Sequence, residues 1–459
     1  MTSKVYIVTD LGPGDGGKGG VVHAVAKSQR AHTIIKRGGA QGSHGVHTSR
    51  GETFAFSQWG CGTFDGIPTH LSEQMIVSPE GLLNESDQLR RQFGIDNPFA
   101  MLSVDRRALV ATPLHGVASH LLELSRGSNP RGTIGAGVGQ AYRDDLRYPE
   151  LTLRMKDLKN PNLREQLYEI RENIRNYILP VVNLSRFLPG DRELVNQEVA
   201  LLQDDGFVEN VAERFAEAAS LTHIVEPDYL GSTILARPGC AVIETSHGVL
   251  TDNVHGFAPH TSAIRTLPRF TRQILDRAGY EGQVVNLGVT RAYAIRHGAG
   301  PLPTTDPTLA EQLLPGSHKQ DNRWQGEVRV GALDGVLLRY AVRVCGGAQA
   351  FDGLAVTWFD QIKKNREWLT ADSYRTYSDD RVFASNGELR VIPETTEHQQ
   401  GHFTTALGSV EPHIESLKIA PEIGNDALYG ICAEKLEAMT DIPVRMVSFG
   451  PTERDKLMK

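Results

Sequence analysis

The stretch Val5-Tyr6-Ile7-Val8-Thr9-Asp10-Leu11-Gly12-Pro13-Gly14-Asp15-Gly16-Gly17-Lys18-Gly19-Gly20 decides the fold. A β-branched, apolar run breaks abruptly into glycine, and the helix-compatible segment 21–26 follows. This order predicts a strand, a phosphate-binding loop and a helix whose positive end faces the same place. Lys18 adds a positive charge to the loop. The backbone amides expected to bind phosphate belong to Gly14, Gly16, Gly17 and Gly19.

The loop departs from a Walker motif at one position. The spacing from Gly12 to Lys18 fits G-x-x-x-x-G-K, but Gly19 stands where Ser or Thr would hold Mg²⁺. Asp15 lies inside the loop instead, so a carboxylate is available to a metal or a proton. The alternative is a plain glycine-rich turn at the end of the first strand, because short motifs also match by accident.

Composition limits the functional classes. The chain has 459 residues, of which 40% are hydrophobic and 22% charged, as in ordinary globular enzymes. The net charge of −7 is spread along the chain, which argues against a nucleic-acid partner. No apolar run approaches the roughly 20 residues of a membrane span, and the N-terminus lacks a signal-peptide pattern. Four scattered cysteines without a C-x-x-C pair favour reduced thiols. We therefore expect a cytoplasmic protein with small-molecule partners.

Two further glycine-rich loops follow. The strand over 33–35 leads into the loop 36–48, and loops at the carboxyl ends of parallel strands meet in one crevice. His44 in this loop would then face the first loop, where it could polarise an oxygen or carry a proton. A surface histidine without a role is the equal alternative. The third loop, 131–144, has a loose G-x-G-x-x-G spacing, but no strong strand precedes it. Wrapping a phosphate or nucleoside is its more plausible use.

The remaining pattern predicts one large α/β domain over 1–459, with a central, mostly parallel sheet and helical insertions. Residues 150–220 are charged and helical in period, which indicates a helical insertion or subdomain. Further strands are expected over 75–77, 100–104, 241–244, 283–290, 353–360 and near 443–451. Helices are expected over 115–124 and 334–344.

Polar side chains gather in several of the later loops. His247, Asp252, His255 and Thr261 could line a pocket after the strand 241–244. Arg296 is a candidate anion clamp at another strand end. The segment 322–331 is expected to be a loop whose two arginines suit a carboxylate or phosphate.

Several of these motifs line up, in order, with one family: the chain resembles adenylosuccinate synthetase. The resemblance spans nearly the whole chain. The family's Gly-Asp-Glu-Gly-Lys-Gly, Gly-Gly-x-Asn-x-Gly-His, Gly-x-Gly-x-Gly-x-Ala-Tyr, Asp-x-x-His-Gly-x-x-Pro-x-x-Thr-Ser and Arg-x-Gly-Ala-Gly-Pro-x-Pro-Thr motifs are similar to residues 14–19, 38–44, 135–142, 252–262 and 296–304.

The resemblance implies a C–N bond-forming ligase of purine nucleotide biosynthesis. GTP would phosphorylate the 6-oxygen of IMP, and L-aspartate would displace that phosphate to give adenylosuccinate. Asp15 would be the base and, with Ser43, would bind Mg²⁺. His44 would donate to the oxygens that gain charge, and Lys18 would hold the phosphates. A homodimer is also implied.

The resemblance also implies two sets of binding residues. For the donor nucleotide these are, besides the loop glycines, Gly45, Asp360, Ser448, Gly450 and Pro451. For the acceptor nucleotide and aspartate they are Gln41, Thr133, Ile134, Arg147, His247, Thr261, Arg323 and Arg329.

Departures from the family motifs keep other functions open. Gly16 replaces a Glu, Ile134 a Thr and His247 a Gln, and 324–329 replaces the family's aspartate loop. A divergent ligase would join aspartate, or another amine, to (d)GMP or another nucleotide with ATP or GTP. A non-catalytic nucleotide-binding paralogue is the third hypothesis. The joint presence of Asp15, Lys18 and His44 argues against that paralogue.

Overall fold

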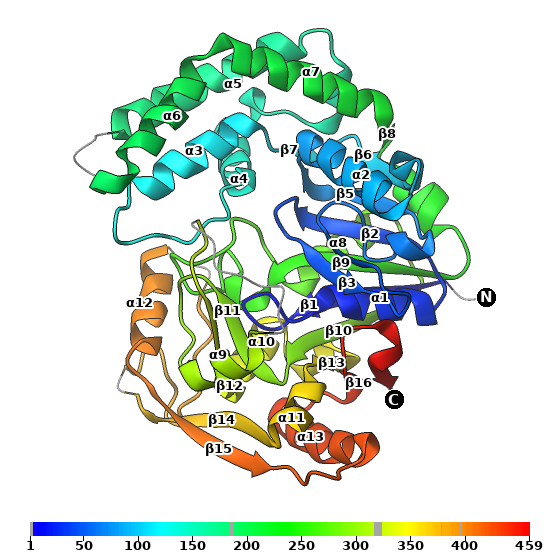
Figure 1. Cartoon of the computed structure of the whole chain (residues 1–459), viewed down its shortest axis with the longest axis vertical. Coiled ribbons are helices and arrows are strands. Elements are labelled where there is room, and N and C mark those ends of the chain that lie inside the picture. Colours follow the sequence, from blue (N-terminus) through cyan, green and yellow to red (C-terminus); the bar gives the residue numbers. More distant parts are fainter. Residues whose placement is uncertain (1–2, 183–186, 316–323, 378, 394–396) are drawn as a thin grey trace.

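The computed structural model describes residues 3–182, 187–315, 324–377, 379–393 and 397–459 (Figure 1). Its centre is an 11-stranded sheet. From one edge to the other the strands are β17 (Lys456–Met458), β16 (Val444–Ser448), β13 (Gly353–Thr357), β10 (Gln283–Arg291), β1 (Lys4–Asp10), β9 (Cys240–Gly248), β2 (Ala31–Gly39), β5 (Thr69–Val77), β6 (Leu102–Asp105) and β8 (His223–Val225), with β7 (Leu109–Val110) beside β5. All pairings are parallel except that of β16 with β17. The predicted α/β fold with a mostly parallel central sheet is confirmed.

The first strand shows why the sheet is continuous and apolar. Val5 and Ile7 belong to one buried cluster, and Tyr6 and Val8 to another, so β1 is covered on both faces. Helix α1 (Lys18–Ser28) packs against β1, β2 and β9, and α8 (Pro268–Arg277) contacts β1 and β5. Because parallel strands buried on both faces need apolar side chains on both, the run 5–8 shows no polar alternation.

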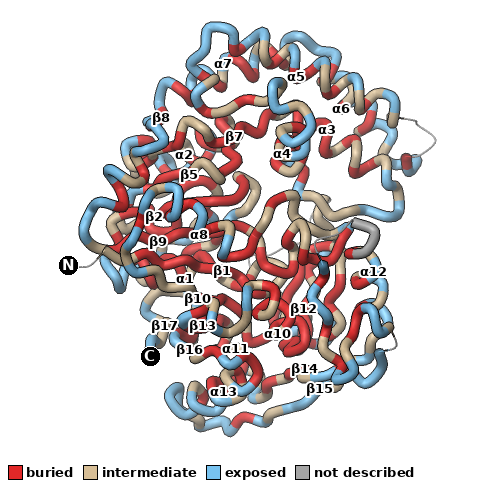
Figure 2. Tube along the Cα trace, turned by 180° about the vertical axis from the view of Figure 1, so that it is seen from behind, coloured by how far each residue is buried: buried red, intermediate tan, exposed pale blue. Residues whose placement is uncertain are grey.

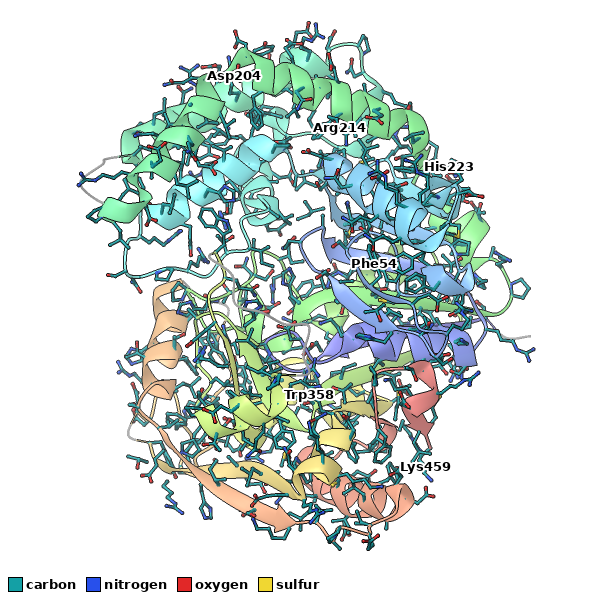
Figure 3. The ribbon with its side chains drawn as sticks, viewed as in Figure 1. Phe54, Asp204, Arg214, His223, Trp358 and Lys459 are labelled. Atoms are coloured by element: carbon teal, nitrogen blue, oxygen red, sulfur yellow. The ribbon has the colours of Figure 1, made fainter. Side chains whose placement is uncertain are left out.

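A helical layer lies beyond the β5–β8 edge of the sheet (Figure 1). It contains α2 (Pro79–Phe93), α3 (Pro113–Leu124), α4 (Val138–Arg147), α5 (Leu163–Ile178), α6 (Arg192–Gln203) and α7 (Asp205–Leu221). The last three lie in the segment 150–220 that is expected to be helical, and α7 ends one residue beyond it. Asp204, labelled in Figure 3, is exposed at the junction of α6 and α7. Helix α3 contacts α4, α5 and α6, which ties this layer to the third glycine loop.

A second sheet, which the sequence pattern did not reveal, lies on the other side. Its order is β11 (Tyr293–His297), β12 (Val328–Asp334), β14 (Glu367–Thr376) and β15 (Glu411–Lys418). The expected loop 322–331 is wrong from residue 328 onward, because β12 begins there. Strand β15 is mostly exposed, as Figure 2 shows, so it lacks the apolar run that marks a central strand.

The remaining elements complete the layers around the two sheets. A hairpin of β3 (His44–His47) and β4 (Thr53–Phe56) follows β2, and α9 (Pro307–Leu313), α10 (Gly335–Val344), α11 (Phe359–Asn365), α12 (Glu397–Leu407) and α13 (Asn425–Thr440) surround the second sheet. The strand expected over 353–360 ends at Thr357, so Asp360 lies in the first turn of a helix. Trp358 has a φ of 67°, which reverses the chain at that point. Among the described residues, no helix combines the length and apolarity that crossing a membrane requires.

Candidate active site

The carboxyl ends of β13, β10, β1, β9 and β2 lie side by side and open into one crevice. The first two glycine loops touch there, as their sequence positions predicted. A Cβ atom added to Gly19 would lie 2.3 Å from the carbonyl oxygen of Gly45, so the start of α1 and the start of β3 are in backbone contact. The crevice therefore brings together residues that are far apart in the sequence, as expected for the open edge of a parallel sheet.

Lys18 is fixed by two partners at the base of the phosphate loop. Its Nζ lies 2.9 Å from Oδ2 of Asp10 and 2.7 Å from the carbonyl oxygen of His247, and the residue is only 4% exposed. Sequence reasoning missed Asp10. An acid that ends an otherwise apolar buried strand is the signal that could have found it, because such a charge requires a partner.

His44 is held by a buried ionic network. Its Nδ1 lies 2.7 Å from Oε1 of Glu244, which is also 2.9 Å from Nζ of Lys36. Glu244 and Lys36 are fully buried, and His44 is 8% exposed. Cys61 is close, and its backbone N–H donates to Glu244 Oε2. Because both carboxylate oxygens already accept hydrogen bonds, this His–Cys–Glu group is a hydrogen-bonded network rather than an open metal site.

The protonation states of this network follow from its burial. Burial lowers the pKa of His44, which leaves its imidazole neutral near pH 7 although Glu244 favours the charged form. Burial alone would raise the pKa of Glu244, but Lys36 and His44 outweigh it and hold that pKa well below its usual range. An ionised Glu244 accepts a hydrogen bond from the Nδ1–H of His44, so the ring presents Nε2 for chemistry. Glu244 and Lys36 were missed as well. Each is a charged residue inside an apolar strand.

Asp15 occupies the apex of the phosphate loop with a φ of 60°. The guanidinium of Arg291 donates to the Asp15 carbonyl oxygen and lies 4.0 Å from the ring centroid of Trp358. Burial lowers the pKa of Arg291 to about 10, against the opposing charges of Asp15, Asp10 and Asp360. The donors proposed for Mg²⁺, the Asp15 carboxylate and the Ser43 carbonyl, are hard oxygen atoms on two touching loops. That donor set fits the ion.

A cavity of about 170 Å³ adjoins the loops. It begins at Pro13 and extends to the third glycine loop. Five of the predicted substrate-binding residues line it: Gln41, Thr133, Ile134, His247 and Thr261. Burial, together with the charges of Lys18 and Arg37, lowers the pKa of His247 to about 4. Its Nε2 lies 3.1 Å from Nε2 of Gln41.

Arginines dominate the far end of this cavity. Arg126, Arg131, Arg143 and Arg296 line it, and Glu123, which pairs with Arg126, is its single acid among the described residues. Arg143 donates to the neutral amide oxygen of Gln140. Arg296 is 4% exposed and donates to the carbonyl oxygens of Ala299 and His260, while its Nη1 has no partner. Burial and the charge of Arg329 lower the pKa of Arg296 to about 9. Such cations are suited to bind an anion.

Other predicted residues lie outside the cavity lining. Arg147 is exposed on α4, with its guanidinium 5.9 Å from the Tyr148 ring centroid. Arg329 donates to the carbonyl oxygens of Gly298 and Gly300, 2.7 Å from each. Arg323 lies outside the described residues.

The expectation that Asp252 and His255 line a pocket is wrong. Asp252 is fully buried and accepts hydrogen bonds from the backbone N–H groups of Val254, His255 and Thr266. It also pairs with Arg265. The two residues shape the loop, whereas His247 and Thr261 face the cavity.

The predicted donor-nucleotide residues gather on the opposite side of the phosphate loop. Lys456 donates to the carbonyl oxygen of Gly450 over 2.8 Å and lies against Gly20. Burial lowers the pKa of Lys456 to about 8. Asp360 accepts a hydrogen bond from the side chain of Gln361, and burial raises the pKa of Asp360. Trp358, labelled in Figure 3, directly follows β13 and precedes α11, the helix that carries Asp360.

Comparison with known proteins identifies the family. A family model described as adenylosuccinate synthetase matches residues 7–458. The chain belongs to the adenylosuccinate synthetase family. Members of this family are ligases that form a C–N bond, and in general they use GTP and Mg²⁺.

Known members of the adenylosuccinate synthetase family are distant in sequence. The Bordetella pertussis adenylosuccinate synthetase is 26% identical over 463 residues, which cover 99% of this chain and 97% of that protein. The Leuconostoc citreum adenylosuccinate synthetase is 27% identical over 376 residues, 80% of each chain. Among solved structures, a fully ligated adenylosuccinate synthetase from Plasmodium falciparum matches with a TM-score of 0.76 at 17% identity, over 99% of both chains. The cyanophage S-2L succinoaminodeoxyadenylate synthetase, bound to dGMP and to dATP as an energy donor, matches with a TM-score of 0.57 at 15% identity, over 100% of this chain and 96% of that one.

Proposed function

We propose that this protein condenses L-aspartate with the 6-oxo position of IMP, driven by GTP through a 6-phosphoryl intermediate, to give adenylosuccinate. The observation that carries the proposal is that Asp15, Lys18 and His44 lie around His247, which lines the arginine-rich cavity. A phosphoryl donor on one side of the phosphate loop and a purine nucleotide on the other would place the 6-oxygen between them.

The residues divide the chemistry in the following way. Asp15 removes the N1 proton of the purine, so that the 6-oxygen becomes nucleophilic. That oxygen attacks the γ-phosphorus, the bond to the β-phosphate oxygen breaks, and the nucleoside diphosphate leaves with Lys18 and the amides at the start of α1 on its phosphates. The amine of aspartate then attacks C6, and inorganic phosphate departs. Mg²⁺, held by Asp15 and Ser43, would supply charge neutralisation at the phosphate oxygens.

His44 stabilises the charge that develops on the transferring group. In the structure without ligands its pKa is lowered by burial, so Nε2 is an acceptor. A phosphate dianion at the crevice favours the charged form of a nearby imidazole. Protonated His44 then donates from Nε2 to the phosphoryl oxygens while Glu244 holds Nδ1.

The donor and acceptor pockets use different residues in this proposal. Asp360, Ser448, Gly450 and Pro451 surround the donor base and ribose. The acceptor nucleotide and aspartate share the cavity lined by Gln41, Thr133, Ile134, His247 and Thr261, with Arg143 and Arg296 in place of the predicted Arg147. We also propose a cytoplasmic homodimer, as is implied by the family.

A second candidate function is ligation of aspartate to GMP or dGMP with ATP or GTP. The observations that favour it are His247 and Ile134 in the acceptor cavity, where the family motifs have Gln and Thr, and the hydrogen bond from Gln361 that occupies one oxygen of Asp360. That oxygen is then less available to read a guanine edge, so the donor base need not be guanine.

One assay tests both functions. The protein is incubated with Mg²⁺, L-aspartate, GTP or ATP, and IMP, GMP or dGMP in turn, and inorganic phosphate and the new nucleotide are measured. We expect turnover with IMP and GTP. Turnover with GMP or dGMP but not IMP would select the second function, and no turnover with any combination would overturn both.

A further inference from the structure

The carboxylate of Asp10 lies inside the curve of the phosphate loop. Oδ1 accepts the backbone N–H of Gly12 over 2.8 Å, and Oδ2 accepts that of Gly16 over 2.8 Å. Oδ2 is also 2.9 Å from Nζ of Lys18. The residue is 1% exposed. A loop that would offer these two amides to a phosphate has therefore already given them to an anion of its own.

The loop sequence is adapted to this carboxylate. A Cβ atom at Gly16 would lie 2.7 Å from Asp10 Oδ2 and 2.9 Å from its Cγ, so a side chain at position 16 and the acid at position 10 exclude each other. The amides that remain for a phosphate are those at the start of α1. Asp10 thus decides which part of the loop meets the ligand.

Asp10 also reaches the acceptor cavity through Lys18. An ammonium group has three N–H donors, and here one goes to Asp10 and one to the carbonyl oxygen of His247. His247 has a φ of 65° and lines the cavity together with Gln41. The third N–H of Lys18 is therefore aimed from a fixed point between the donor and acceptor sides.

We propose that Asp10 is a positioning residue, which sets the shape of the phosphate loop and fixes Lys18 where the two sides of the site meet. In this chain the acid at the end of β1 takes the place of the acidic side chain that the family motif carries at position 16. The effect on turnover rests on the proposed function, whereas the positioning of Lys18 is a property of the folded loop.

The first experiment compares Asp10→Asn with a matched control. Asp105 also ends a strand, is 1% exposed, and accepts the N–H two residues later over 2.8 Å. Asp105→Asn therefore removes a comparable buried carboxylate, with a similar backbone hydrogen bond, at a position outside the site. We expect Asp10→Asn to lower kcat about 10- to 100-fold, because Lys18 is no longer held in place. The KM for the triphosphate should stay unchanged or fall, because a negative charge beside the phosphates has been removed. Asp105→Asn should leave both parameters within twofold. A folded Asp10→Asn enzyme with kcat within threefold of the wild type overturns the proposal.

The second experiment exchanges the two positions. Gly16→Glu and Asp10→Gly should each lose activity, the first through the steric conflict with Asp10. The double variant Asp10→Gly/Gly16→Glu should regain at least tenfold over the weaker single variant. A double variant no better than the weaker single one would contradict the mutual exclusion on which the proposal depends.

A third readout needs no turnover. Lys18 in the folded protein is modified with acetic anhydride, and the rate is followed by peptide mass spectrometry. Release from Asp10 should make modification of Lys18 at least fivefold faster in Asp10→Asn than in the wild type or Asp105→Asn. An unchanged rate overturns the positioning role. If no substrate combination turns over but Lys18 is released as expected, the proposed function fails and the positioning role stands.

Discussion

The cations on the two sides of the crevice have different partners. On the phosphate-loop side, Lys18 pairs with Asp10 and Lys36 with Glu244, both over 2.9 Å. On the cavity side, Arg143 and Arg296 donate only to amide and carbonyl oxygens and meet no carboxylate among the described residues. Arg296 is buried, so its uncompensated charge is costly, whereas Arg143 is exposed at the cavity wall. The difference indicates that the paired charges position groups, whereas these two arginines are available to a ligand anion.

The largest effect is expected at the apex of the paired side. Asp15→Asn removes the proposed base while Asn tolerates the left-handed backbone that Asp15 adopts. We expect kcat to fall about 10³-fold or more, with the melting temperature almost unchanged. Steady-state kinetics and thermal unfolding check this. Activity within tenfold of the wild type would remove Asp15 from the mechanism.

Breaking the Lys36–Glu244 pair should cost both stability and activity. Glu244→Gln leaves a fully buried ammonium without its carboxylate, which lowers the free energy of unfolding by about 3–5 kcal/mol. It also weakens the hold on Nδ1 of His44, so kcat should fall about 10²-fold. Urea unfolding and kinetics measure the two effects.

A double variant separates the effect on stability from the effect on activity. Lys36→Met/Glu244→Gln removes both buried charges and should recover most of the stability, but not the activity, because His44 still lacks its ionised partner. Recovery of activity along with stability would show that Glu244 acts on the fold alone.

On the unpaired side, the sharpest comparison is between two arginines of α4. Arg143 lines the cavity, whereas Arg147, one turn later, is exposed outside it. Arg143→Gln should raise the dissociation constant of IMP about 10- to 100-fold, the value of one charge-assisted hydrogen bond, and leave that of inosine unchanged. Arg147→Gln should stay within twofold. Calorimetry with both ligands checks this, and equal effects of the two variants would contradict the assignment.

The same helix shows what the sequence could and could not predict. The convergence of Asp15, Lys18 and His44 followed from glycine loops at the ends of parallel strands, since that topology gathers such loops at one edge. The choice between Arg143 and Arg147 depends on where α4 begins and how it is rotated, and no local signal places a helix start that follows a loop with three glycines.

The partners of the site residues were beyond prediction for a related reason. Glu244 meets His44 across 200 positions of sequence, and Lys18 meets His247 across 229. A charged residue in an apolar strand indicates that a partner exists, but the sequence does not say which one. The second sheet was missed because β15 is exposed and charged, so burial and alternation were absent there.

The smallest effect is expected at His247, which lies between the paired and unpaired sides. Its folded pKa of about 4 is below the 6.5 of an unfolded imidazole, so only the unfolded chain gains this proton as the pH falls from 6.5 to 4. Its contribution to stability is present above pH 6.5 and is lost across that window. His247→Asn keeps a side chain that tolerates the positive φ and removes the titration. Between pH 7 and 4.5, we expect the melting temperature of His247→Asn to fall by roughly 1–3 °C less than that of the wild type. Parallel melting curves across this range would mean that His247 is already charged in the folded protein, and that the cations around it are compensated without a ligand.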